Sequence, residues 1–152
     1  MIKNIVKTPA VPTLFCRLAV GLIFLSEGLQ KYIRPEDVGT GRFEKIGFSA
    51  PAFWAYFTGS FEIACGILIL LGLLTRLAAI PLLIIMITAF VSTKLPILMD
   101  KGFWSFAHEY RTDFAMTLLL IFLLIYGGGR KSIDRKISRN LKPPMYGKFK
   151  SY

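Results

Sequence analysis

The chain has 152 residues, a length typical of one domain. Hydrophobic residues make up 54% of it and the mean hydropathy is +0.55. Charged residues make up 18%, against roughly 25% in soluble domains. This composition excludes a disordered protein and argues against a water-soluble globule. Lys and Arg outnumber Asp and Glu by 19 to 9, and in a membrane protein such an excess reports on orientation, so we expect contact with the lipid bilayer and none with nucleic acid.

Four stretches are long and apolar enough to cross a bilayer, which takes about 20 such residues. The predicted spans are about 13–33, 52–74, 77–93 and 114–129. A soluble bundle would show a polar face on each helix, whereas residues 80–87 and 118–125 are apolar on all sides. The sequence therefore predicts one all-α domain over residues 1–152, an integral membrane four-helix bundle.

The charges between the spans predict the orientation. Lys3 and Lys7 precede the first span, Arg76 lies in the short second link, and eight basic residues against Asp134 alone follow the fourth span. The two longer loops each hold three basic and three acidic residues. By the positive-inside rule, both termini are predicted to be cytoplasmic and the two longer loops to lie outside.

The basic tail, 130–152, has a pattern of its own. Ile133, Ile137 and Leu141 recur every four residues, with basic residues between them. This pattern predicts a short helix on the inner leaflet, because one face is apolar and the other is attracted to anionic lipid. A disordered basic tail is the alternative.

Four charged residues fall inside the first two spans: Arg17, Glu27, Lys31 and Glu62. Each such charge costs about 2.5–3.5 kcal/mol at a helix centre, so it needs a partner or a function. We expect an intramembrane polar cluster in which Lys31 or Arg17 pairs with Glu62, or in which Glu62 is protonated. The cluster either pins the first span to the second or lines a cavity that binds a quinone head group or relays a proton through Glu62.

Small residues in the same spans predict close helix packing. Gly21, Gly28 and Gly66 are interpreted as contact points between helices. No phosphate-binding loop, dinucleotide fingerprint or nucleophile elbow occurs, and the sole histidine, His108, lies in a predicted loop. We therefore expect no catalytic residues, no metal site and no independent catalytic activity.

A short internal repeat is also present. The tripeptide RLA occurs at 17–19 and again at 76–78, each time at the start of a predicted span that leads to a returning one. This favours two parallel hairpin repeats, although Glu62 has no counterpart within the fourth predicted span.

Three patches together carry a family resemblance. They are RLAVG at 17–21 with GLQKY at 28–32, EIACG at 62–66 with LLGLLTRLAA at 70–79, and GGGRKSID at 127–134. Their order and spacing resemble the DoxX family of small four-helix bacterial membrane proteins. The resemblance covers about residues 13–134 and implies a multi-pass protein of the bacterial cytoplasmic membrane.

The resemblance also implies a role. The family takes its name from a subunit linked to quinone-dependent thiosulfate oxidation, so we expect a non-catalytic membrane subunit or accessory protein of a quinone-linked redox system. Quinone is the one cofactor implied, and other membrane or redox subunits are the implied partners. Thiol–disulfide chemistry is not expected, because the chain lacks the paired cysteines of some relatives. A small-molecule or lipid transporter, and a purely structural subunit of a larger complex, are the alternatives.

Overall fold

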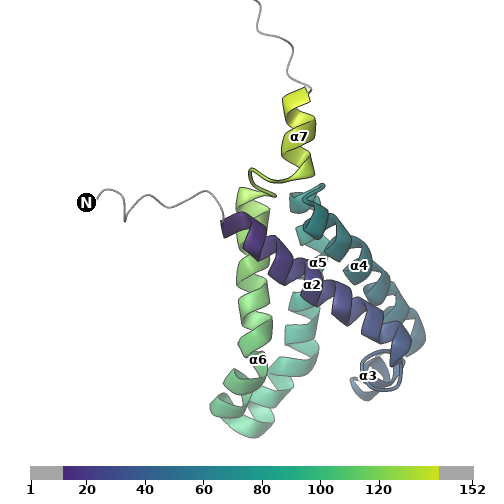
Figure 1. Cartoon of the computed structure of the whole chain (residues 1–152). Coiled ribbons are helices and arrows are strands. Elements are labelled where there is room, and N and C mark those ends of the chain that lie inside the picture. Colours follow the sequence, from purple (N-terminus) through teal and green to yellow (C-terminus); the bar gives the residue numbers. More distant parts are fainter. Residues whose placement is uncertain (1–11, 141–152) are drawn as a thin grey trace, which may run out of the picture.

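The computed structural model describes residues 12–140, and within them every regular element is helical. In chain order the elements are α2 (Pro12–Ile33), α3 (Thr40–Lys45), α4 (Pro51–Leu71), α5 (Thr75–Ala89), the π-helix η1 (Phe90–Lys94), α6 (Leu95–Tyr126) and α7 (Ile133–Asn140). The all-α class is confirmed. The start of α2, the α4–α5 turn and the end of α6 lie at one end of the molecule, and α7 extends beyond them (Figure 1).

Three helical stretches are long and apolar enough to cross a membrane: Thr13–Ile33, Pro51–Leu71 and Thr75–Tyr126. The third combines α5, η1 and α6. Its backbone leaves helical geometry at Gly102, where φ is 79° and ψ is 175°. There the chain reverses, and α6 runs back beside α5 (Figure 1).

The segment 94–113 thus differs from the predicted loop. It is helical except at Gly102, since the backbone widens into the π-helix η1 just before Pro96 and continues into α6 instead of ending there. Gly102 is then the only residue of the segment with a positive φ, and glycine adopts that conformation without a steric penalty.

Glycines bring α2 and α4 into close contact. A Cβ atom added to Gly28 would lie 2.8 Å from the carbonyl oxygen of Gly59, and one added to Gly66 would lie 3.1 Å from that of Gly21. The first distance is too short for a methyl group, and the second is shorter than most contacts of a real Cβ atom. The two helices therefore cross backbone to backbone at two levels, which is how small residues act in membrane helix pairs.

The core lies where α2, α4, α5 and α6 meet. Its fully buried side chains include Val20, Ile69, Leu82, Leu120 and Leu123. Many large apolar side chains point outward instead, such as Ile84, Leu118 and Ile125, which are all exposed. An apolar exterior on this scale suits lipid and not water, so the helices are those of a multi-pass membrane protein in contact with the bilayer.

Part of the predicted tail is visible as α7. Ile133 and Ile137 are exposed on it, at 36% and 44% of their surface. Residues 141–152, which include Leu141 of the predicted apolar stripe, lie outside the described residues, as do Lys3 and Lys7.

Candidate functional site

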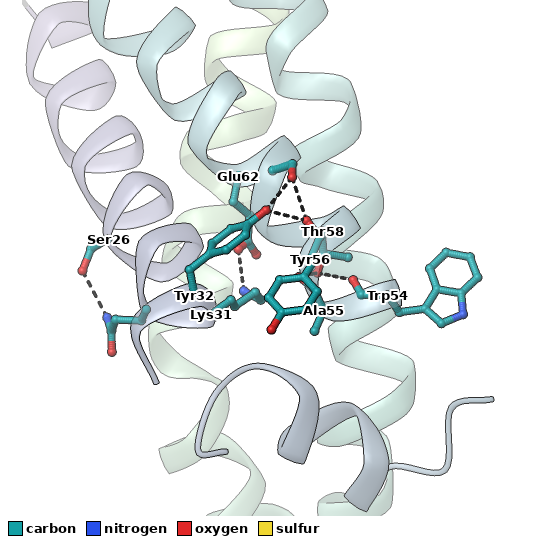
Figure 2. Close-up of polar contacts among 10 residues, drawn as sticks. Ser26, Lys31, Tyr32, Trp54, Ala55, Tyr56, Thr58 and Glu62 are labelled. Atoms are coloured by element: carbon teal, nitrogen blue, oxygen red, sulfur yellow. Dashed lines mark hydrogen bonds and ion pairs between the residues drawn. The ribbon is translucent and has the colours of Figure 1, made fainter. Parts of the chain in front are cut away.

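A buried ion pair joins the first two long helices. Lys31, in the last turn of α2, donates a hydrogen bond from Nζ to Oε2 of Glu62 in the middle of α4 (Figure 2). Lys31 is 8% exposed and Glu62 is 4% exposed. The close crossing of the helices at Gly28 and Gly59 brings the backbone of α2 near that of α4 on the side where the pair forms.

The ammonium group of Lys31 has hydrogen-bonding capacity left over. It carries three N–H donors, and among the described residues its one hydrogen bond is the bond to Glu62. A buried donor without a partner is costly in a membrane. The remaining donors can bind a further hydrogen-bond acceptor in the space beside the pair.

A cavity of about 580 Å³ lies against this pair. Its volume falls within the range of small-molecule sites, about 300–1,000 Å³. The walls come from α2, from α3 and the residues after it, and from α4, α5, η1 and α6. The aromatic lining residues are Phe24, Phe43, Phe48, Trp54 and Phe57, and the aliphatic ones include Ile23, Ile84, Ile85 and Met116.

The charges on the cavity walls balance. Three basic and three acidic side chains line it: Lys31, Arg42 and Lys94, and Glu27, Glu62 and Asp113. Taken as ionised, they sum to zero. The site therefore offers local donors and acceptors without a net field that would select an anion or a cation.

The helices form two antiparallel hairpins, α2 with α4 and α5–η1 with α6. Lys94 forms a second ion pair, within the α5–η1–α6 hairpin. Its Nζ donates to the carbonyl oxygen of Glu109 at 3.0 Å and lies 3.3 Å from Oδ2 of Asp113. The exposed carboxylate of Glu109 is further away, with Oε2 at 3.9 Å from the same Nζ. Lys94 is 8% exposed and ends the π-helix η1. Pro96 contributes to this irregular turn, because it has no N–H for the carbonyl of Ser92 and its ring crowds that carbonyl.

The structure separates Arg17 from the other predicted site residues. Lys31 and Glu62 are in contact, and Glu27 lines the same cavity. Arg17 lies at the opposite end of α2 and makes four hydrogen bonds to backbone carbonyls, those of Ile69, Leu70, Gly128 and Lys131, at 2.6–3.1 Å. Arg17 thus binds backbone carbonyls at the end of α4 and in the link between α6 and α7, and it does not bind Glu62.

No metal-binding group is formed by the part of the chain that the structure covers. No three His, Cys, Asp or Glu side chains of residues 12–140 are placed to hold an ion. The lysines and aromatic rings of the cavity are also not metal ligands of the usual kinds.

Residues 13–95 match the model of the DoxX family. This region is more than half of the chain, and it includes Lys31, Glu62 and Lys94. The chain belongs to the DoxX family. The resemblance seen in the sequence patches is confirmed.

Two relatives of this DoxX protein cover most of its length. An uncharacterized membrane protein of Mycobacterium tuberculosis is 54% identical, over 84% of this chain and 83% of its own. CatD of Bacillus subtilis, named as a candidate oxidoreductase, is 28% identical, over 90% of this chain and 94% of its own. No solved structure gives a significant match.

Sequence reasoning missed part of the DoxX protein's cavity. Arg42, Lys94 and Asp113 belong to the charges of the two longer predicted loops, and none of them is a predicted site residue. A signal was present for the last two: Lys94 directly follows the third predicted span and Asp113 directly precedes the fourth. Residues at the facing ends of two antiparallel neighbouring helices lie close together, so their pairing could have been predicted.

Proposed function

We propose that this protein is a membrane subunit or accessory protein of a quinone-linked redox system, without catalytic activity of its own. In this proposal the cavity beside Lys31 and Glu62 binds the head group of a quinone. The observation that carries it is a buried, incompletely hydrogen-bonded ion pair on the wall of a large, mostly apolar cavity.

The residues of the cavity fit a quinone. A quinone head group is flat, neutral and apolar apart from its carbonyl oxygens. Aromatic side chains such as Phe57 and Trp54 suit a flat ring, and Lys31 can donate to a carbonyl. The balanced wall charges favour a neutral ligand over a fatty-acid anion. A 28% identical relative named as a candidate oxidoreductase supports the redox setting.

The cavity is also placed for a ligand that arrives through the bilayer. Phe57 on α4 and Ile84 on α5 both line it, and they are 45% and 59% exposed on an apolar exterior. The two hairpins diverge away from the α4–α5 turn (Figure 1). We therefore propose that a lipid-soluble molecule enters sideways, between α4 and α5.

The proposed topology has four passes through a bacterial cytoplasmic membrane, with both termini inside. In this topology the helical arms before and after the reversal at Gly102 each cross the membrane once, which is supported by the length of the third stretch, 52 residues. Arg76, Arg130 and Lys131 lie at the end of the molecule where α2 begins, and the positive-inside rule places this end in the cytoplasm. On this side, α7 would meet the anionic inner leaflet.

Tryptophan fluorescence tests the binding proposal. Trp54 lines the cavity, whereas Trp104 does not and is 84% exposed. The Trp104→Phe variant of the full chain, in mild detergent, is titrated with 2-methyl-1,4-naphthoquinone. We expect saturable quenching of Trp54, and only linear, collisional quenching of Trp104 in the matched Trp54→Phe variant.

A paired substitution then connects binding to the site. Lys31→Met with Glu62→Met removes both charges and leaves no unpaired one. We expect it to abolish the saturable quenching. If the two single-tryptophan variants, which keep Lys31 and Glu62, show equal and non-saturable quenching, the proposal is overturned. If a phospholipid displaces the quinone and binds with similar affinity, the result would support the lipid-carrier alternative instead.

A further inference from the structure

We infer that Lys94, together with Asp113, is a second ligand-binding group of the cavity, and that the ligand carries hydrogen-bond acceptors at two separate points of its head group. The inference rests on the proposed function, since it concerns the same cavity. It goes beyond it by assigning a second binding pair and by restricting the class of ligand.

The first step is that the two hairpins are built alike. Arg17, at the start of α2, donates from Nη2 to the carbonyl oxygen of Leu70 near the end of α4, at 2.6 Å. Arg76, at the start of α5, donates from Nη2 to the carbonyl oxygen of Ile125 near the end of α6, at 2.7 Å. These are the two arginines of the repeated tripeptide, and each joins the first helix of its hairpin to the end of the second.

The ends of the returning helices also correspond. α4 is followed by Gly72 with φ 69°, and α6 by Gly127 with φ 72°. In both hairpins the arginine thus contacts a helix end that is followed by a glycine with a positive φ, in the αL conformation at Gly72 and with an extended ψ of −163° at Gly127. The short sequence repeat therefore marks a structural repeat.

The second step is that each hairpin holds one buried lysine that is paired with a carboxylate of its returning helix. Lys31 on α2 pairs with Glu62 on α4, and Lys94 after α5 pairs with Asp113 on α6. Lys31 follows Arg17 by 14 residues and Lys94 follows Arg76 by 18, while Glu62 precedes Gly72 by 10 and Asp113 precedes Gly127 by 14. The second hairpin is longer by the same four residues, about one helical turn, in both arms. Asp113 is therefore the counterpart of Glu62 that the fourth predicted span lacked.

The third step is that the Lys94 side chain points into the protein. Its neighbours Val91 and Leu95 are 56% and 37% exposed, whereas Lys94 is 8% exposed. The wider turn of η1 contributes to this inward position, and single π-turns within α-helices are frequent at functional sites. A lysine that merely ended a membrane helix would extend its flexible stem toward water.

Together these steps describe a cavity with one lysine–carboxylate pair on each of two opposite walls. Lys31 and Glu62 belong to the first hairpin, Lys94 and Asp113 to the second, and all four line the same cavity. Each lysine can donate to an acceptor between the hairpins. A neutral molecule with two acceptors, such as a diketone or a quinone, uses both lysines, whereas a molecule with one acceptor leaves one lysine unused.

The test compares two ligands and two chains. The full chain carrying Trp104→Phe is titrated in detergent with 2-methyl-1,4-naphthoquinone, which has two carbonyl groups. The monocarbonyl 1-tetralone is then used to displace it. We expect 1-tetralone to bind at least about tenfold more weakly, since one charge-assisted hydrogen bond is lost.

The paired variant Lys94→Met with Asp113→Asn should weaken quinone binding by a similar factor and remove the preference for two carbonyl groups. The matched control Lys101→Met changes a lysine of the same segment that does not line this cavity, and it should bind like the unaltered chain. Should the paired variant fail to fold, the comparison of the two ligands on the unaltered chain decides alone.

The outcomes separate this inference from the proposed function. Saturable binding that Lys31→Met with Glu62→Met abolishes, but that Lys94→Met with Asp113→Asn leaves unchanged, would overturn only the second binding group. Equal affinity of the unaltered chain for the two ligands would do the same. Absence of saturable quenching at Trp54 in the chain that carries Trp104→Phe alone would overturn the proposed function, and the inference with it.

Discussion

Arg17 and Asp134 contact the two sides of the turn that joins α4 to α5. Arg17 donates to the carbonyl oxygens of Ile69 and Leu70 in the last turn of α4. Asp134 accepts hydrogen bonds from the backbone N–H groups of Leu74, at 2.7 Å, and Thr75, at 3.2 Å. A cation thus lies at the negative end of one helix dipole and an anion at the positive end of the next.

This arrangement ties the start of α7, and the segment before it, to the bundle. Leu74 has φ 48°, a left-handed conformation that is unfavourable for a residue with a side chain, and its hydrogen bond to Asp134 helps to offset that cost. Arg17 also contacts the carbonyl oxygens of Gly128 and Lys131. The two residues therefore hold the ends of α4, α5 and α6 together.

Arg17→Lys should lower the free energy of unfolding by about 3 kcal/mol, because one ammonium cannot reach the carbonyl oxygens that the guanidinium fork contacts. The measurement is thermal or denaturant unfolding in detergent. Arg34→Lys is the matched control: Arg34 lies in an exposed ion pair with Asp37, so its replacement should change little. Equal effects of the two substitutions would contradict a structural role for Arg17.

Asp134→Ala should destabilise the protein by about 1–2 kcal/mol, since it removes a carboxylate cap from the first N–H groups of α5. The same unfolding measurement applies. Asp37→Ala removes an equivalent but exposed side chain and should cost less than about 0.5 kcal/mol. If Asp134→Ala is as mild as Asp37→Ala, the cap does not contribute to stability.

Glu62→Gln should destabilise the protein by about 3–5 kcal/mol, because Lys31 would keep a buried charge without its counter-ion. Cys65→Ala, three residues further along the same face of α4 and also buried, should cost about 1 kcal/mol. Both variants are compared by unfolding in detergent and by complementation in cells. Equal tolerance would mean that Glu62 is protonated and neutral, and it would remove Glu62 from the site.

Cysteines placed at Glu44 and Lys101 should react with a membrane-impermeant maleimide in intact cells. Both positions are exposed, and both lie in the segments that the charge pattern assigns to the outside. A cysteine at Arg130, exposed at the other end of the molecule, should react only after the membrane is permeabilised. The reverse pattern of labelling would invert the proposed orientation.

A peptide of residues 131–141 should bind vesicles that contain anionic lipid and bind neutral vesicles far less. It carries four basic residues, and each contributes about 1 kcal/mol near an anionic surface. Replacing these four with glutamine provides the control, which should bind both kinds of vesicle equally weakly. Equal binding of the natural peptide to both would rule out an electrostatic attachment of the tail.

The sequence by itself determined the class of this protein. Long apolar blocks predicted the membrane helices, and α2 and α4 begin and end within about three residues of the predicted spans, because hydropathy is a property of local composition. The cost of charge in lipid singled out Arg17, Glu27, Lys31 and Glu62, and the family was recognisable from short patches in a fixed order.

The tertiary structure decided which of these residues meet. Lys31 contacts Glu62, and Arg17 does not, because the crossing of α2 and α4 at their glycines sets the depth at which side chains face each other. The contact between Lys94 and Asp113 depends on a reversal at Gly102 and on an irregular turn before Pro96. Composition does not reveal which lysine pairs with which carboxylate, since the pairing follows from the relative rotation and depth of whole helices.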